Sequence, residues 1–95
     1  MTEIERIKSI VAPIAKKYGV EKVWLFGSRA RGDAKPNSDY DFLISCGKIR
    51  SLWDFAGLWD DLEEAFSSKV DIVTDTADDK DFIERIRKEE VYIYG

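Results

Sequence analysis

Segments with the apolar spacing of a helix alternate along this chain with segments that have the apolar pattern of a strand. This alternation is the feature that most restricts the possible folds of the chain. Apolar residues return every three or four positions, as in a helix, over residues 2–19, 51–66 and 79–88. Strand-like apolar runs cover residues 20–26, 39–45, 70–74 and 91–94. Strands and helices that alternate in this way form a sheet with helices packed against it. The sequence therefore predicts an α/β fold, a small mixed sheet with helices packed mainly on one face.

The first helical segment carries its own start and stop signals. Thr2 followed by Glu5 has the spacing of a capping box, and Gly19 is suited to end the helix. Pro13 lies inside the apolar pattern. Because proline lacks the backbone N–H and crowds the preceding turn, we expect it to kink this helix or to divide it in two.

Length and charge exclude several classes of protein. The chain has 95 residues, the size of one small domain, and we expect residues 1–95 to form that domain. Its 19 acidic and 15 basic residues give a formal charge of −4, which argues against direct nucleic-acid binding. Cys46 is the single cysteine, so no intramolecular disulfide can form. No apolar run nears the roughly 20 residues of a membrane span, and we expect a cytoplasmic protein without a membrane anchor.

Asp39 and Asp41 are the first candidate site residues. They lie two positions apart on a predicted strand, so their side chains share one face, with Cα atoms about 6.6 Å apart. Bringing two carboxylates to about 4 Å costs on the order of 4 kcal/mol at an effective dielectric constant near 20. A cation between the two side chains would remove that cost.

Asp71 supplies a third carboxylate. It lies in an otherwise apolar strand between Val70 and Ile72, where an aspartate is unfavourable unless it has a partner. If this strand lies beside that of Asp39 and Asp41, the three carboxylates form one cluster. Such oxygen ligands suit Mg²⁺, and the chain has no histidine for a zinc site. Two Mg²⁺ ions there could activate an attacking hydroxyl and stabilise a leaving pyrophosphate.

Gly27 and Ser28 follow directly after the first predicted strand. Glycine lets a phosphate approach the backbone closely, and the serine hydroxyl can donate to it. Ser28 could also cap the next helical turn. Arg29 and Arg31 lie nearby. They could contact the phosphates directly, or they could belong to a solvated basic loop. Ser38 can cap a turn or contact the nucleotide.

These motifs together resemble one family. Gly27-Ser28, ten intervening residues and then Asp39-Tyr40-Asp41 resemble the signature of the DNA polymerase β-type nucleotidyltransferase superfamily. The segments similar to its minimal members are residues 25–32, 38–42 and 91–94, together with the leading helix and Asp71. The resemblance therefore extends over almost the whole chain.

The resemblance implies a role for each motif. Asp39, Asp41 and Asp71 would bind two Mg²⁺ ions, and Asp71 would also assist deprotonation of the acceptor hydroxyl. Gly27 and Ser28 would hold the β- and γ-phosphates of ATP.

A protein acceptor is also implied by the resemblance. Minimal members similar to this chain are commonly encoded beside a HEPN-type RNase toxin, and some act as antitoxins by transferring AMP to a tyrosine of that toxin. Two alternatives stay open. One is a binding module that neutralises its partner by occlusion, and the other is a transferase acting on a small hydroxylated molecule such as an aminoglycoside.

Trp53 and Trp59 bear on possible partners. They lie six positions apart, about 600° of helical rotation, so they do not share one helix face. We expect one of them to be partly exposed, where it could mark a partner surface or a homo-oligomer contact. Simple core packing is the alternative.

Overall fold

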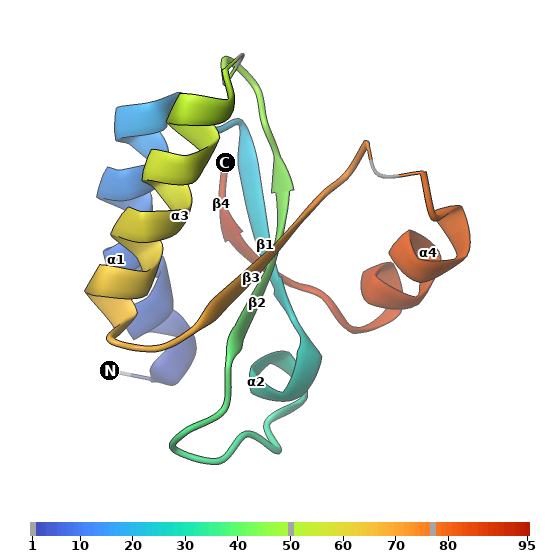
Figure 1. Cartoon of the computed structure of the whole chain (residues 1–95). Coiled ribbons are helices and arrows are strands. Elements are labelled where there is room, and N and C mark those ends of the chain that lie inside the picture. Colours follow the sequence, from blue (N-terminus) through green and yellow to red (C-terminus); the bar gives the residue numbers. More distant parts are fainter. Residues whose placement is uncertain (1, 50, 77) are drawn as a thin grey trace.

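A four-stranded mixed sheet with the strand order β3-β2-β1-β4 forms the centre of the computed structural model (Figure 1). Residues 2–49, 51–76 and 78–95 are described. The elements are α1 (Glu3–Tyr18), β1 (Lys22–Phe26), α2 (Gly27–Arg31), β2 (Tyr40–Ser45), α3 (Leu52–Phe66), β3 (Val70–Thr74), α4 (Lys80–Glu89) and β4 (Val91–Tyr94). β1 pairs antiparallel with β2 and β4, whereas β2 and β3 are parallel. This architecture confirms the α/β fold.

The two faces of the sheet carry separate apolar clusters. α1 and α3 lie side by side over one face, and α4 lies on the opposite side (Figure 1). Alternate residues of a strand point to opposite faces. Accordingly, Val23 and Leu25 belong to the large core, whereas Trp24 and Phe26 belong to the smaller cluster under α4. β1 is therefore covered on both faces.

The helix ends follow their local signals. The Thr2 hydroxyl accepts a hydrogen bond of 3.1 Å from the Glu5 amide, and Gly19 ends α1 in the left-handed conformation with φ 73°. α1 nevertheless continues through Pro13 without division. Its buried face, which includes Ile7 and Val11, packs on the sheet and offsets the missing hydrogen bond. Across residues 2–49, 51–76 and 78–95, no helix combines the length and apolar character that crossing a membrane requires.

The two tryptophans of α3 differ as expected. The Trp59 indole donates a hydrogen bond of 2.7 Å to the Val70 carbonyl and joins the edge of the large core. Trp53 is 87% exposed and lies beside Leu52, which is 82% exposed. These two exposed side chains lie at the first turn of α3, directly after the Ser51 cap.

Candidate functional site

The parallel pairing of β2 with β3 brings two acidic side chains together. Asp41 is in register with Asp71, and neighbouring strands run about 4.8 Å apart. Both side chains point to the α4 side of the sheet, because Tyr40 and Phe42 point into the large core. Asp39 directly precedes β2, two positions before Asp41. The condition set for an acidic cluster, that the Asp71 strand lies beside the Asp41 strand, is therefore met.

The electrostatic environment of Asp41 reflects this arrangement. Its pKa is raised to about 6, first by burial, then by the negative charges of Asp71 and Asp39. The positive charge of Arg31 lowers the same pKa in part. The charges of Asp39, Asp71 and Arg31, all candidate site residues from the sequence, therefore act on the Asp41 carboxylate.

The donor set fits a hard divalent cation. Carboxylate oxygens are the ligands that Mg²⁺ prefers, and a cation would relieve the repulsion that raises the pKa of Asp41. Within the part of the chain that the structure describes, no three acidic or thiol side chains converge closely enough to form a complete metal site. Asp39, Asp41 and Asp71 would therefore have to draw together around an ion.

Gly27 brings the backbone against this acidic pair. It opens α2 with φ +74°, a conformation that glycine adopts without strain. A Cβ at this position would collide with the Asp41 carboxylate. Only a residue without a side chain lets the end of β1 pass so close to Asp41. The sequence predicted that a phosphate would approach the backbone closely at Gly27. In the structure the Asp41 carboxylate is the group that lies close to this backbone.

Glu89, at the end of α4, fills the space beside Gly27. Its carboxylate accepts hydrogen bonds of 3.2 Å from the Gly27 amide and 3.2 and 3.4 Å from the Arg31 guanidinium. Arg31 also donates to Asp33, and these bonds, led by that to Glu89, raise the pKa of Arg31. The Gly27 amide and Arg31 thus form an anion-binding arrangement that an internal carboxylate occupies.

Sequence reasoning did not identify Glu89. It lies 62 positions from Gly27, and nothing in its local sequence distinguishes it from the other acids of the chain. Only the docking of α4 on the sheet brings the two residues together.

The remaining predicted residues have structural partners. Ser28 is the second residue of α2 and its carbonyl accepts from the Gly32 and Asp33 amides; Phe26, not Ser28, holds the cap position. The Ser38 hydroxyl accepts 2.8 Å from the Lys35 amide, which matches the expected turn cap. The Arg29 side chain is only 8% exposed, so a solvated basic loop is the wrong description of it.

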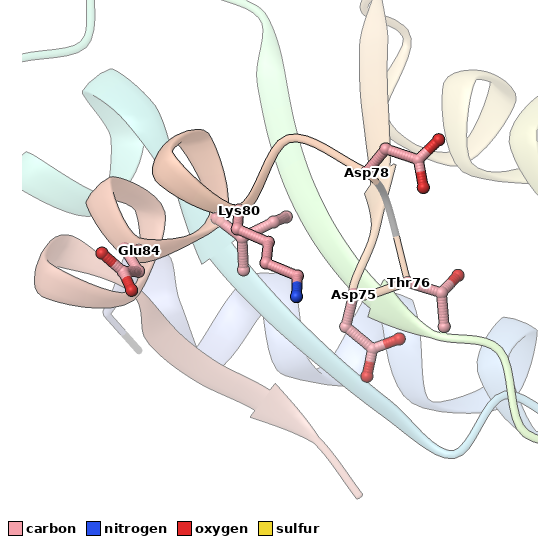
Figure 2. Close-up of a pocket in the computed structure, with 6 residues that line it drawn as sticks. Asp75, Thr76, Asp78, Lys80 and Glu84 are labelled. Carbon is pink, nitrogen blue, oxygen red and sulfur yellow. The ribbon is translucent and has the colours of Figure 1, made fainter.

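Two separate hollows lie on the α4 side of the sheet. The hollow beside the acids has a volume of about 390 Å³ and is lined by Phe26, Gly27, Arg31, Phe82, Arg85, Ile86 and Glu89. The other, of about 410 Å³, lies between the end of β3 and α4, where Lys80 extends to the side of Asp75 (Figure 2). Asp75 follows Asp71 by four residues, or about 13 Å along a strand. The second hollow is therefore distinct from the acidic pair.

Known proteins resemble the chain in sequence and in fold. The sequence pattern described as "Polymerase beta, Nucleotidyltransferase" matches residues 8–95. The protein adenylyltransferase MntA of Thermococcus cleftensis is 32% identical over 97 residues, which span 98% of each chain. A solved structure described as a minimal nucleotidyltransferase has 30% identity and a TM-score of 0.77, with 95% of both chains covered.

A further solved structure shares the fold alone. It is a complex of the tri-AMPylated Shewanella oneidensis HEPN toxin with an MNT antitoxin, and the matching chain has a TM-score of 0.73 at 15% identity. The match covers 97% of the present chain and 72% of that one.

The raised pKa of Asp41 predicts a pH-dependent stability. Because the folded pKa of about 6 exceeds the ordinary value of 3.8, the folded state binds the proton more tightly than the unfolded state. This contribution is present below pH 4 and is lost as pH rises through 6. In EDTA, the Tm of Asp41→Asn should therefore rise relative to wild type across this window. Thermal unfolding from pH 4 to 8, with the exposed Asp60→Asn as control, tests this. Parallel curves for Asp41→Asn and wild type would contradict it.

Two glycines with similar backbones give a matched test of the close approach at Gly27. Gly32 has φ +84°, and a Cβ added there would meet no atom within 4 Å, whereas Gly27 has φ +74° and faces Asp41. Gly32→Ala should cost about 1–2 kcal/mol of unfolding free energy. Gly27→Ala should cost about 1–3 kcal/mol more, from the added overlap. Urea unfolding measures both, and equal losses would rule out the steric role of Gly27.

Proposed function

The chain belongs to the polymerase beta nucleotidyltransferase family, and from this membership we propose that it transfers AMP from ATP to a hydroxyl group of a protein. The acceptor we propose is a tyrosine of a HEPN-type toxin, so that the transfer makes the chain an antitoxin. The observation that carries the proposal is the register of Asp41 with Asp71 opposite the Gly27 backbone. Residues 1–95 would act as one minimal transferase domain in the cytoplasm.

The proposed chemistry is an in-line displacement. The acceptor oxygen forms a bond to the α-phosphorus of ATP as the bond to the β-phosphate oxygen breaks, and pyrophosphate leaves. Asp71 takes the proton of the acceptor hydroxyl, directly or through water. Asp39, Asp41 and Asp71 would hold two Mg²⁺ ions, which neutralise charge on the triphosphate and lower the pKa of the acceptor hydroxyl when bound.

Phosphate binding falls to the residues around Gly27. The Gly27 amide and the Ser28 hydroxyl would donate to the β- and γ-phosphates, and Arg31 would balance their charge. The binding of Glu89 at the same amide and guanidinium supports this role, because it places an anion there already. A triphosphate would have to displace Glu89. Ser38, whose hydroxyl closes a turn beside Asp39, would shape the edge of the site.

The proposed acceptor rests on relatives. The Thermococcus cleftensis protein is named a protein adenylyltransferase, and its 32% identity extends over 98% of this chain. That likeness favours a protein acceptor over a small molecule such as an aminoglycoside. A non-catalytic module that neutralises its partner by occlusion is the second candidate. The Glu89 carboxylate, which fills the proposed phosphate position, is the observation that favours it.

Transfer of label from α-³²P-ATP tests the two candidates. With Mg²⁺ and the partner toxin, the wild type should label one protein band. Asp39→Asn/Asp41→Asn should reduce labelling on the order of 10³-fold, because metal-assisted charge stabilisation is worth several kcal/mol. Asp60→Asn/Asp75→Asn is a matched control with the same change in charge. If the wild type labels nothing above the double mutant but still blocks the toxin, the occlusion module is correct.

Replacement of Glu89 should strengthen nucleotide binding. Glu89→Gln removes an anion that competes with the nucleotide for the Gly27 amide and Arg31. Because this ion pair is exposed and therefore weak, the Kd for a non-hydrolysable ATP analogue should fall by about two- to fivefold, measured by calorimetry. The control is Glu90→Gln, because Glu90 pairs with Arg87 and not with Arg31. A higher Kd in Glu89→Gln would mean that Glu89 holds Arg31 in place for the nucleotide.

A further inference from the structure

Arg29 follows the Gly27-Ser28 motif directly and is a cation whose side chain is largely covered. It belongs to α2, a short surface helix, yet its side chain is only 8% exposed. An arginine so covered needs partners for its donors. Those partners identify what the residue does.

The guanidinium of Arg29 binds the backbone of the segment that leads to Asp39. Nη2 donates 2.7 Å to the Ser38 carbonyl and 3.3 Å to the Pro36 carbonyl, and Nε donates 3.2 Å to the Ser38 carbonyl. Nη1 donates 2.8 Å to the Glu3 carboxylate at the start of α1. These four bonds take most of the five N–H groups of a guanidinium. The N–H donors of Arg29 are therefore mostly used within the protein, and few are available for a phosphate.

The same guanidinium also contacts the residue after Asp39. Its central carbon lies 3.9 Å from the centre of the Tyr40 ring, a cation–π contact. Tyr40 is buried, and its hydroxyl accepts 2.9 Å from Arg6. Arg29 thus binds the residue on each side of Asp39, the carbonyl of Ser38 and the ring of Tyr40.

Asp39 has one further backbone anchor beside it, the Tyr40 amide, which donates 3.1 Å to the Lys69 carbonyl. The β1–β2 register ends at Asp41, and the β2–β3 register begins at Tyr40, so Asp39 lies just outside both ladders. The segment before it contains Pro36 and is closed by the turn between Lys35 and Ser38. The position of the Asp39 carboxylate relative to Asp41 consequently depends on what anchors this segment.

We propose that Arg29 is a positioning residue that holds the backbone at Asp39 beside Asp41, from where the two carboxylates can draw together around one metal ion. The planar fork of arginine suits this task, because it reaches two carbonyls while its face lies on an aromatic ring. This inference rests on the metal-dependent transfer proposed above. It assigns the two arginines of α2 different tasks, since Arg31 is exposed and faces the anion position.

Metal binding tests the proposal without reliance on turnover. Arg29→Lys keeps the charge and much of the stem but cannot bind two carbonyls as a fork. We expect its affinity for Mn²⁺, titrated by electron paramagnetic resonance, to be about 10-fold weaker than that of the wild type. Half-maximal transfer should need about 10-fold more Mg²⁺, with the KM for ATP unchanged. Glu3→Gln, which removes the ion pair but leaves the carbonyl bonds, should behave as the wild type.

The outcomes separate this inference from the proposed function. Measurements are made where thermal unfolding shows each variant to be folded, with Arg29→Ala as a second variant that should lose at least as much Mn²⁺ affinity. Wild-type Mn²⁺ affinity in folded Arg29→Lys and Arg29→Ala would overturn the positioning role. A raised KM for ATP at an unchanged Mg²⁺ requirement would overturn it in favour of phosphate contact. A wild type that binds no Mn²⁺ would overturn the metal-dependent function itself.

Discussion

The parallel pairing of β2 with β3 is the constraint on which the site depends. Its register sets Asp41 beside Asp71 on the side of the sheet away from α1 and α3. Burial, together with the repulsion that follows from this register, raises the pKa of Asp41 to about 6. The strands hold this unfavourable arrangement because their other face, with Phe42 and Val70 fully buried, is anchored in the large core. Apolar packing on one face thus stabilises an acidic pair on the other.

The opposite side of the sheet is closed by a much smaller apolar cluster. Phe26, Leu43 and Ile86 form it, and the Phe82 ring meets Phe26 edge-on with centroids 6.3 Å apart. Phe82 and Ile86 pack α4 over the end of β1, and Glu89 at the end of this helix reaches the Gly27 amide. Because fewer apolar side chains hold α4 than hold α1 and α3, we expect it to be the helix that shifts most readily when an anion enters the site.

The local sequence indicated most of the framework and several site residues. Strand spacing placed Asp39 and Asp41 on one face, and Asp71 was conspicuous as an acid in an apolar strand. Whether Asp71 and Asp41 meet depends on strand order, which periodicity does not contain. We expected Pro13 to kink α1 or to divide it, and division does not occur, since the stabilising contacts of that helix come from the sheet beneath it.

The sequence by itself determined the alternation of helices and strands, the placing of acids in and beside two strands, and the glycine that the turn after β1 requires. These properties follow from spacing along the backbone and from the conformations each residue allows. Only the tertiary structure decided which charges meet. Glu89 reaches Gly27 across 62 positions, and Arg29 turns from solvent to bind the carbonyl before Asp39. Such contacts depend on how whole elements dock, and docking is set by the summed packing of many apolar side chains.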